Sequence, residues 1–283
     1  MPSIPRGDVT ASLHFYAPPT DSSPPFNYVE TPPPGEPQRN YSDTIQPTLI
    51  HDLRGSETLP TLPTLDHDAF QILQNIPPSS ETSFTDPDSI KENYYPEVEA
   101  LLLASIPGSS KIHIFDHTIR RADPNAPRSP VLRVHIDQTA PSVEKRIRRY
   151  FPVEDAEKLL RGRYRIVNVW RPLNKGPVES FPLAFASSAT LEDGDVVPIE
   201  HRYRDGYVGQ IAAIRYNAAQ KWYYLSGMTG SERVLLECFD SESLKEGSRI
   251  GGRVPHTAFV DPRTGDGAEG RESIEVRALV FGP

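Results

Sequence analysis

From Tyr164 to its end the chain consists of short apolar runs separated by turn residues, and this pattern limits the fold more than any other feature. We expect strands at 164–170, 208–216, 222–225, 234–239, 255–260 and 273–281, with shorter ones earlier at 50–54, 69–73 and 111–115. Asp86 and Pro87 open a helical pattern that continues to residue 107, and two further helices are expected at 142–149 and 153–160. Helices followed by closely spaced strands predict an α+β protein that is mainly β, an antiparallel sandwich or barrel with flanking helices.

The first 41 residues differ from the rest in composition. Of the 30 prolines in the 283 residues, ten fall in the first 40, including the run Pro32-Pro33-Pro34. Such a segment favours extended, weakly structured chain. The aromatic pairs Phe15-Tyr16 and Phe26-Asn27-Tyr28 interrupt it and predict that it lies over the body of the protein. We therefore expect a proline-rich arm at 1–41 and a single domain at 42–283.

Charge and cysteine content exclude several classes of protein. The formal net charge is -8 and no lysine or arginine tract stands out, so we do not expect a nucleic-acid partner. Cys238 is the only cysteine, which excludes intrachain disulfides and cysteine-based zinc sites and suits a reducing compartment. The start has no signal-peptide pattern, and no apolar run approaches about 18 residues. The expected protein is cytoplasmic and not bound to a membrane; its partner is a small molecule, and a homodimer is left open.

The stretch Leu132-Arg133-Val134-His135-Ile136-Asp137 reads as a strand at the middle of the chain. Side chains alternate between the two faces of a strand, so His135 and Asp137 point the same way. An imidazole and a carboxylate so placed can reach one metal ion. With a second histidine they would form the two-histidine, one-carboxylate set that holds non-haem iron and leaves coordination positions open. A structural histidine beside a solvated aspartate is the alternative.

A second histidine and an anion-binding pair follow in the last part of the chain. His256 opens the strand expected at 255–260, and Arg271 and Ser273 lead into the final strand on a shared face. Arginine can bind a buried carboxylate through two charge-assisted hydrogen bonds, and a serine hydroxyl can add a third. The order His-x-Asp, His, Arg-x-Ser thus supplies a metal triad and a separate grip for a dicarboxylate. Arg277, on the same strand face, is the second candidate for that grip; an ion pair with Glu275 is its alternative role.

Longer stretches resemble a known family. They include His135-Ile136-Asp137-Gln138-Thr139 and Pro255-His256-Thr257-Ala258-Phe259, together with 52–55, 94–98, 115–121, 164–173, 222–228 and 271–280. These stretches span residues 42 to 281 and are similar to the fungal hydroxylase/desaturase branch of the iron(II)/2-oxoglutarate-dependent oxygenases, which includes gibberellin desaturase and cephem-methoxylase-like proteins.

The resemblance implies a double-stranded β-helix (jelly-roll) core and a role in secondary metabolism. It implies His135, Asp137 and His256 as ligands of Fe(II), and Arg271 with Ser273 on the distal carboxylate of 2-oxoglutarate. It also implies O2 as cosubstrate and hydroxylation or desaturation of an unactivated C–H bond. We expect substrate contacts from Arg120, Asn168, Trp170, Tyr216 and Tyr224, with a core or surface role open for each.

Two alternatives remain at this stage. The first is a non-haem iron oxidase that does not use 2-oxoglutarate, which would keep the triad and have no need of Arg271. The second is a non-catalytic β-sandwich binding protein whose histidines are structural. A serine- or cysteine-based hydrolase is poorly supported, because the chain has no Gly-x-Ser-x-Gly motif and Cys238 lies among apolar neighbours.

Overall fold

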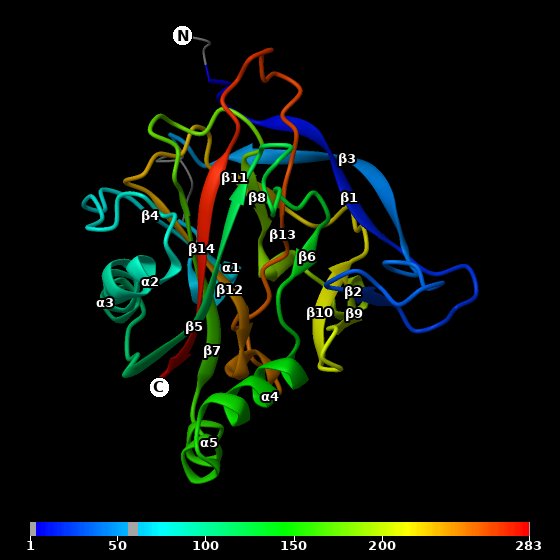
Figure 1. The fold of residues 1–283 in the computed structure, drawn as a ribbon, viewed down its shortest axis with the longest axis vertical. Coiled ribbons are helices and arrows are strands. Elements are labelled where there is room, and N and C mark those ends of the chain that lie inside the picture. Colours follow the sequence, from blue (N-terminus) through cyan, green and yellow to red (C-terminus); the bar gives the residue numbers. More distant parts are fainter. Residues whose placement is uncertain (1–3, 56–61, 283) are drawn as a thin grey trace.

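The computed structural model describes residues 4–55 and 62–282, which form two β-sheets and a small set of helices (Figure 1). The larger sheet has the strand order β1-β3-β11-β8-β13-β6-β10-β9-β2. Its strands are β1 (Val9–Ala17), β2 (Phe26–Tyr28), β3 (Ser42–Asp52), β6 (His135–Ile136), β8 (Leu183–Ala186), β9 (Val196–Arg202), β10 (Val208–Ile214), β11 (Trp222–Tyr224) and β13 (His256–Ala258).

The smaller sheet has the order β4-β12-β7-β14-β5, and all its neighbouring strands are antiparallel. Its strands are β4 (Phe70–Leu73), β5 (Lys111–Arg121), β7 (Tyr164–Pro172), β12 (Arg233–Asp240) and β14 (Glu272–Phe281). The α-helices are α1 (Leu65–Asp68), α2 (Pro87–Ser89), α3 (Tyr95–Ser105), α4 (Ala140–Tyr150) and α5 (Val153–Leu159). A π-helical turn, Ile90–Tyr94, joins α2 to α3, and 3-10 turns cover Ser188–Thr190, Asp193–Asp195 and Ser241–Leu244.

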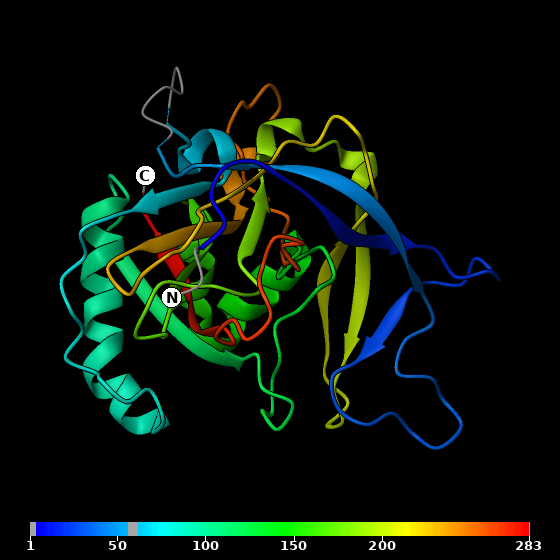
Figure 2. The same ribbon diagram turned by 90° about the horizontal axis from the view of Figure 1, so that it is seen from above.

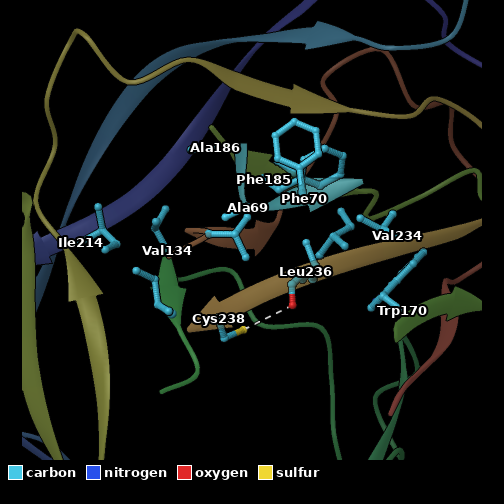
Figure 3. Packing of buried hydrophobic residues seen from close by; sticks show 14 of the residues in the cluster. Ala69, Phe70, Val134, Trp170, Phe185, Ala186, Ile214, Val234, Leu236 and Cys238 are labelled. Atoms are coloured by element: carbon cyan, nitrogen blue, oxygen red, sulfur yellow. Dashed lines mark hydrogen bonds between the residues drawn. The ribbon is translucent and has the colours of Figure 1, made fainter. Parts of the chain in front are cut away.

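The main hydrophobic core lies between the two sheets. Figure 3 shows Phe70 and Leu236 of the smaller sheet packing near Phe185 of the larger one, with the Phe70 and Phe185 ring centroids 4.5 Å apart. The same core buries Cys238 completely, and burial raises the pKa of its thiol well above the ordinary value. A neutral, buried thiol does not act as a nucleophile, in agreement with the sequence.

The opposite face of the smaller sheet packs against α3 and the turns before it. Val98 and Leu102 of α3 join Ile274 and Val276 of β14 in a second apolar cluster. Figures 1 and 2 show α2 and α3 along this side of the sheet. β14 therefore presents its even-numbered apolar residues to the helices, and its odd-numbered residues 271 to 277 face the other way, as alternation requires.

Local signals set the helix boundaries as expected. The Asp86 side chain accepts a hydrogen bond from the Asp88 N–H at 3.0 Å, and Pro87 occupies the first turn of α2. Pro96 lies in the first turn of α3, where its missing N–H costs nothing, and the π-helical turn before it absorbs the irregularity. The helices expected at 142–149 and 153–160 are α4 and α5.

The structure corrects three expectations about strands. Val9–Ala17 is not weakly structured: it is β1, paired with β3 over nine residues, and Leu13 and Phe15 are fully buried. The proline content of the segment as a whole obscures this alternation. β1 itself contains no proline, and the first one after it is Pro18. The strand expected at 111–115 is longer, because β5 continues through Asp116–Arg121. The central strand is shorter than expected: β6 covers only His135–Ile136, and Arg133 forms an isolated bridge with His14.

β2 (Phe26–Tyr28) also belongs to the larger sheet, where it pairs in parallel with β9. The aromatic residues of the proline-rich segment thus bind it to the body of the protein, as the sequence suggested. Residues 1–3 of that segment lie outside the described part of the chain. Among the helices that the structure describes, none has the length and apolar character needed to cross a membrane.

Candidate metal and cosubstrate site

Two neighbouring strands of the larger sheet bring the two predicted histidines together. His135 on β6 pairs directly with His256 on β13 in an antiparallel register. Their ring centroids are 4.4 Å apart, and His256 is buried while the His135 side chain is 18% exposed. The long separation in sequence is thus closed by one strand pair.

Asp137 completes the cluster from the residue after β6. One ligand atom from each of His135, Asp137 and His256 lies within 4.8 Å of the other two. The Asp137 carboxylate is 3.5 Å from Nε2 of His135 and accepts a hydrogen bond from Nδ2 of Asn168 at 2.8 Å. Asn168 belongs to β7 of the smaller sheet, so the cluster lies between the sheets.

Backbone carbonyls fix the orientation of both imidazoles. Nδ1 of His135 lies 2.8 Å from the Arg133 carbonyl oxygen, and Nδ1 of His256 lies 3.1 Å from that of Val254. A carbonyl oxygen can only accept, so Nδ1 carries the proton in each ring. This leaves each Nε2 with a lone pair, the tautomer that a metal-binding histidine needs.

The electrostatic surroundings keep the cluster in the protonation state that binds a cation. Burial opposes ionisation of Asp137, but the His135 contact and the charge of Arg277 together hold its pKa well below the ordinary value. Burial, and then the neighbouring His135, lowers the pKa of His256 to about 4. At neutral pH the carboxylate is charged and the His256 ring is neutral.

Arg271 is a buried guanidinium without a carboxylate partner. It is 2% exposed, donates one hydrogen bond from Nη1 to the Phe181 carbonyl at 2.7 Å, and its Nε has no hydrogen-bond partner among the described residues. Its charged end lies 5.5 Å from the ring of Trp170. Burial, and then the nearby Arg120, lowers its pKa to about 9, so the group stays charged at neutral pH. Ser273, two residues along the same strand face, is also buried.

Arg277, the second candidate for an anion grip, is already engaged. Its Nε donates to Asp116 at 2.7 Å and its Nη2 to Thr118 at 2.8 Å. Its Nη1 is 3.6 Å from both the Asp137 and Glu275 carboxylates. Its function is therefore to hold the carboxylates around the cluster, and Arg271 is the guanidinium with donors to spare.

A cavity of about 440 Å³ opens beside the cluster. His135, Asp137, Arg120 and Arg277 line its inner part, and residues from α4, β9, β10 and the loop before β6 form its other walls. A volume of this size suits a small organic molecule.

The predicted substrate contacts divide into three groups. Arg120 lines the cavity, as expected. Asn168 and Trp170 do not line the cavity: Asn168 is fully buried and donates a hydrogen bond to Asp137, and the Trp170 ring centroid lies 5.5 Å from the charged end of Arg271. Tyr216 and Tyr224 are not among the cavity residues.

The two tyrosines have other surroundings. Tyr216 follows the end of β10 and is 41% exposed, with its ring edge on Phe15. Tyr224 is buried elsewhere: its hydroxyl donates to the Gly7 carbonyl at 2.7 Å and accepts from Arg263 at 2.9 Å. Strand periodicity separates the two faces of a strand but does not tell which length of it faces a cavity.

Sequence reasoning missed most of the outer cavity wall. The missed residues include Tyr41, Arg133, Gln138 and Arg146, the aromatic group His201, Tyr203 and Tyr207, and residues of β10. One signal was available, because Arg146 lies in the basic helix directly after the His-x-Asp strand. The aromatic group lies in and after β9, a strand that the sequence did not reveal.

A two-sheet barrel with two imidazoles and one carboxylate between its sheets defines the class of mononuclear non-haem metal oxygenases. Comparison with known proteins agrees. The family described as "Oxidoreductase/YMDC permease-like domain" matches residues 13–281. The chain is 37% identical to "Hydroxylase/desaturase poxK" of Penicillium oxalicum, over 99% of this chain and 93% of that protein. It is 32% identical to "Alpha-ketoglutarate-dependent dioxygenase phiK" of a fungal species, over 97% and 96% of the two chains.

A solved structure, "iron and alpha-ketoglutarate-dependent endoperoxidase NvfI", superposes with a TM-score of 0.82 at 26% identity, covering 98% of this chain and 99% of that one. The chain belongs to this family of fungal hydroxylases and desaturases. It is an iron(II)- and 2-oxoglutarate-dependent dioxygenase of secondary metabolism that acts on a small molecule with O2. The predicted jelly-roll core is confirmed, and the alternatives of a 2-oxoglutarate-independent oxidase and a non-catalytic binding protein fall away.

Proposed function

We propose that His135, Asp137 and His256 bind the Fe(II) ion of this oxygenase. The donor set supports the proposal: two neutral imidazole nitrogens and one carboxylate oxygen are typical of non-haem Fe(II) sites with open positions. The single observation that carries it is the convergence of these three ligand atoms within 4.8 Å. The carbonyls of Arg133 and Val254 and the amide of Asn168 then orient the ligands.

Arg271 and Ser273 are proposed to bind the distal carboxylate of 2-oxoglutarate. A buried guanidinium whose Nε lacks a partner costs stability unless an anion completes its hydrogen bonds. Arg271 can offer a carboxylate a charge-assisted contact in a site closed to water, and the Ser273 hydroxyl lies on the same strand face. This reasoning selects Arg271 over Arg277, whose donors are taken.

When bound, iron and 2-oxoglutarate supply with O2 the oxidising power to remove hydrogen from an unactivated C–H bond. The protein contributes placement and protection. Asn168 and Arg277 hold the Asp137 carboxylate in position, and the core between the sheets keeps water from the inner side of the site. The substrate lies in the cavity, where its position decides between hydroxylation and desaturation.

The metal assignment is tested with His135→Ala and Asp137→Ala, and His67→Ala serves as a matched control because its side chain is 68% exposed. Wild type and H67A should bind one equivalent of Fe(II) under anaerobic conditions and convert 2-oxoglutarate to succinate slowly without substrate. H135A and D137A should lose both Fe(II) binding and the formation of succinate, and should keep the far-ultraviolet circular dichroism of wild type. Full iron binding by either variant would show that the ligand set is different.

The compartment and assembly also belong to this proposal. We place the enzyme in the cytoplasm, supported by the single buried cysteine, and leave a homodimer open. A fluorescent fusion in a fungal host and light scattering of the purified chain test these two points.

A further inference from the structure

The cavity has a charge opposite to that of the chain. The protein has a formal net charge of -8. Among the described residues, however, the cavity is lined by five arginines and two carboxylates, Asp116 and Asp137. The arginines are Arg120, Arg128, Arg133, Arg146 and Arg277. An acidic protein that gathers arginines around its reaction site has built a place for negative charge.

Two of these arginines are already neutralised by the protein. Nε of Arg133 lies 3.1 Å from the Asp43 carboxylate, and Arg277 donates to Asp116 at 2.7 Å. The other three form no ion pair with any residue of the described ranges. Arg120 donates only to the Ser129 carbonyl, at 3.1 Å, and its charge lies close enough to Arg271 to lower that residue's pKa. Arg120 is therefore next to the proposed 2-oxoglutarate site.

Arg146 is held in place with unused donors. It projects from α4 with its charged end 4.2 Å from the ring centroid of Phe115, and its Nε is buried without a hydrogen-bond partner in the part of the chain that the structure describes. Stacking on the ring fixes the plane of the guanidinium and leaves its N–H edge available. A fixed guanidinium that lines a cavity is suited to bind an anionic group.

A flat wall accompanies Arg146 in the same cavity. The rings of His201 and Tyr203 stack with centroids 5.4 Å apart and planes at 28°, and Nδ1 of His201 is also buried without a partner. Burial raises the pKa of Tyr203, and the charges of Arg146 and Arg277 oppose the rise, so this hydroxyl is within electrostatic reach of both. The wall offers aromatic surface for packing.

We infer that the substrate of this oxygenase is an organic anion whose charged group, a carboxylate or a phosphate, binds Arg146 and whose flat body packs on His201 and Tyr203. The inference rests on the proposed function, because it takes the neighbouring metal cluster as the place of reaction. The cavity volume of about 440 Å³ accommodates such a molecule beside 2-oxoglutarate.

The test uses the full chain with bound Mn(II) and saturating 2-oxoglutarate, a complex that does not carry out the reaction. Equilibrium dialysis measures how tightly this complex binds three probes: 2-naphthoate, 2-naphthyl phosphate and the neutral methyl 2-naphthoate. Wild type should bind at least one of the two anions about 10- to 100-fold more tightly than the ester, the range expected for a hydrogen-bonded charge. The better of the two anions identifies the charged group.

Arg146→Gln should abolish this preference, and Arg146→Lys should keep part of it. Arg148→Gln on the same helix should leave it unchanged, because Arg148 is exposed and pairs with Glu144 and Glu157. Absence of a preference for the anions in wild type, or an unchanged preference in R146Q with wild-type thermal stability, would overturn the inference. Loss of Mn(II) or 2-oxoglutarate binding in wild type would instead contradict the proposed function, since those measurements do not involve the probes.

Discussion

Among the arginines that the smaller sheet buries, those of two regions differ in how their charge is balanced. Near one end of β7 and β12, Arg163 pairs with the fully buried Asp240, with Nε 3.0 Å and Nη2 2.5 Å from its Oδ2. Arg165 adds a contact to the same carboxylate at 3.4 Å. At the start of β14, Arg271 is as deeply buried and has a single carbonyl for a partner.

The difference separates structural charge from functional charge. A buried ion pair whose members satisfy each other belongs to the fold, and removal of one partner leaves the other uncompensated. Arg271 has no carboxylate partner among the described residues, and its buried Nε has no hydrogen-bond partner there, so an anionic ligand can complete its contacts. Arg163 and Arg165 therefore maintain the sheet, whereas the open contacts of Arg271 agree with its proposed role in binding the cosubstrate.

The largest effect is expected at the structural pair. Asp240→Asn should lower the free energy of unfolding by about 2–3 kcal/mol, because it removes the fully buried carboxylate that Arg163 and Arg165 share. The loss is partial, since Asp66 stays 2.6 Å from Arg163 and Glu237 stays 3.7 Å from Arg165. Urea unfolding followed by circular dichroism measures this. Asp193→Asn is the matched control, since Asp193 pairs with Arg253 at 2.7 Å but is 92% exposed; its loss should cost less than about 1 kcal/mol. Equal effects in the two variants would remove the distinction between the regions.

Arg271→Met should weaken binding of the cosubstrate and leave the stability of the fold unimpaired. Loss of the charge-assisted contact is expected to raise the KM for 2-oxoglutarate about 10- to 100-fold. Thermal stability in the absence of 2-oxoglutarate should stay the same or rise, because methionine removes an uncompensated buried charge. A variant that unfolds as easily as D240N and keeps its KM would show that Arg271 is structural.

A smaller effect is expected where a neutral residue supports the metal cluster. Asn168→Ala removes the 2.8 Å hydrogen bond to Asp137, whereas the contact of Asp137 with Arg277 at 3.6 Å remains. Fe(II) affinity should therefore fall about tenfold, as is usual when a group that orients a metal ligand is lost. Titration against a chelator measures this. An unchanged affinity would mean that Arg277 alone positions the carboxylate.

The smallest effect is expected at a carboxylate that neutral donors satisfy. Glu81 accepts hydrogen bonds from the Ser89 hydroxyl and the Phe84 and Ser83 N–H groups, which lower its pKa from 4.5 to about 2. This stabilisation is present above pH 4.5 and is lost as the pH falls toward 2. Glu81→Gln should therefore lower stability at pH 7 and differ less from wild type at pH 3. If the difference in unfolding free energy between E81Q and wild type were the same at pH 7 and pH 3, the lowered pKa of Glu81 would be contradicted.

The sequence predicted the parts of the fold that depend on local pattern. The helix start at Asp86, the alternation in β7 and β14 and the His-x-Asp spacing are all read within a few residues. β1 was missed because its alternation lies in a proline-rich context. β8 was missed because it has only four residues, and β9 because Pro198 and the polar run Glu200-His201-Arg202 interrupt its apolar pattern. The full length of β5 was missed because Asp116–Arg121 is polar, and it is polar because Asp116 and Arg120 line a cavity.

The site could be predicted only where a motif carries it. His135, Asp137 and His256 were placed by spacing and order, and their convergence now supports the assignment. The outer cavity could not be predicted, because Arg146 and Tyr203 meet there only through the packing of α4 against the larger sheet. The position of Tyr224 away from this cavity could not be predicted for the same reason: an aromatic residue on a strand can face the core or a cavity, and only the tertiary fold decides.

The pairing of β6 with β13 has one further consequence. These strands contain two and three residues, and the described register joins them at His135 and His256. A slip by a single position would turn one imidazole to the opposite face. Under the proposed ligand assignment, a chain with this pairing out of register would lack one of the three iron ligands. Correct alignment of two very short strands would thus be a condition for metal binding.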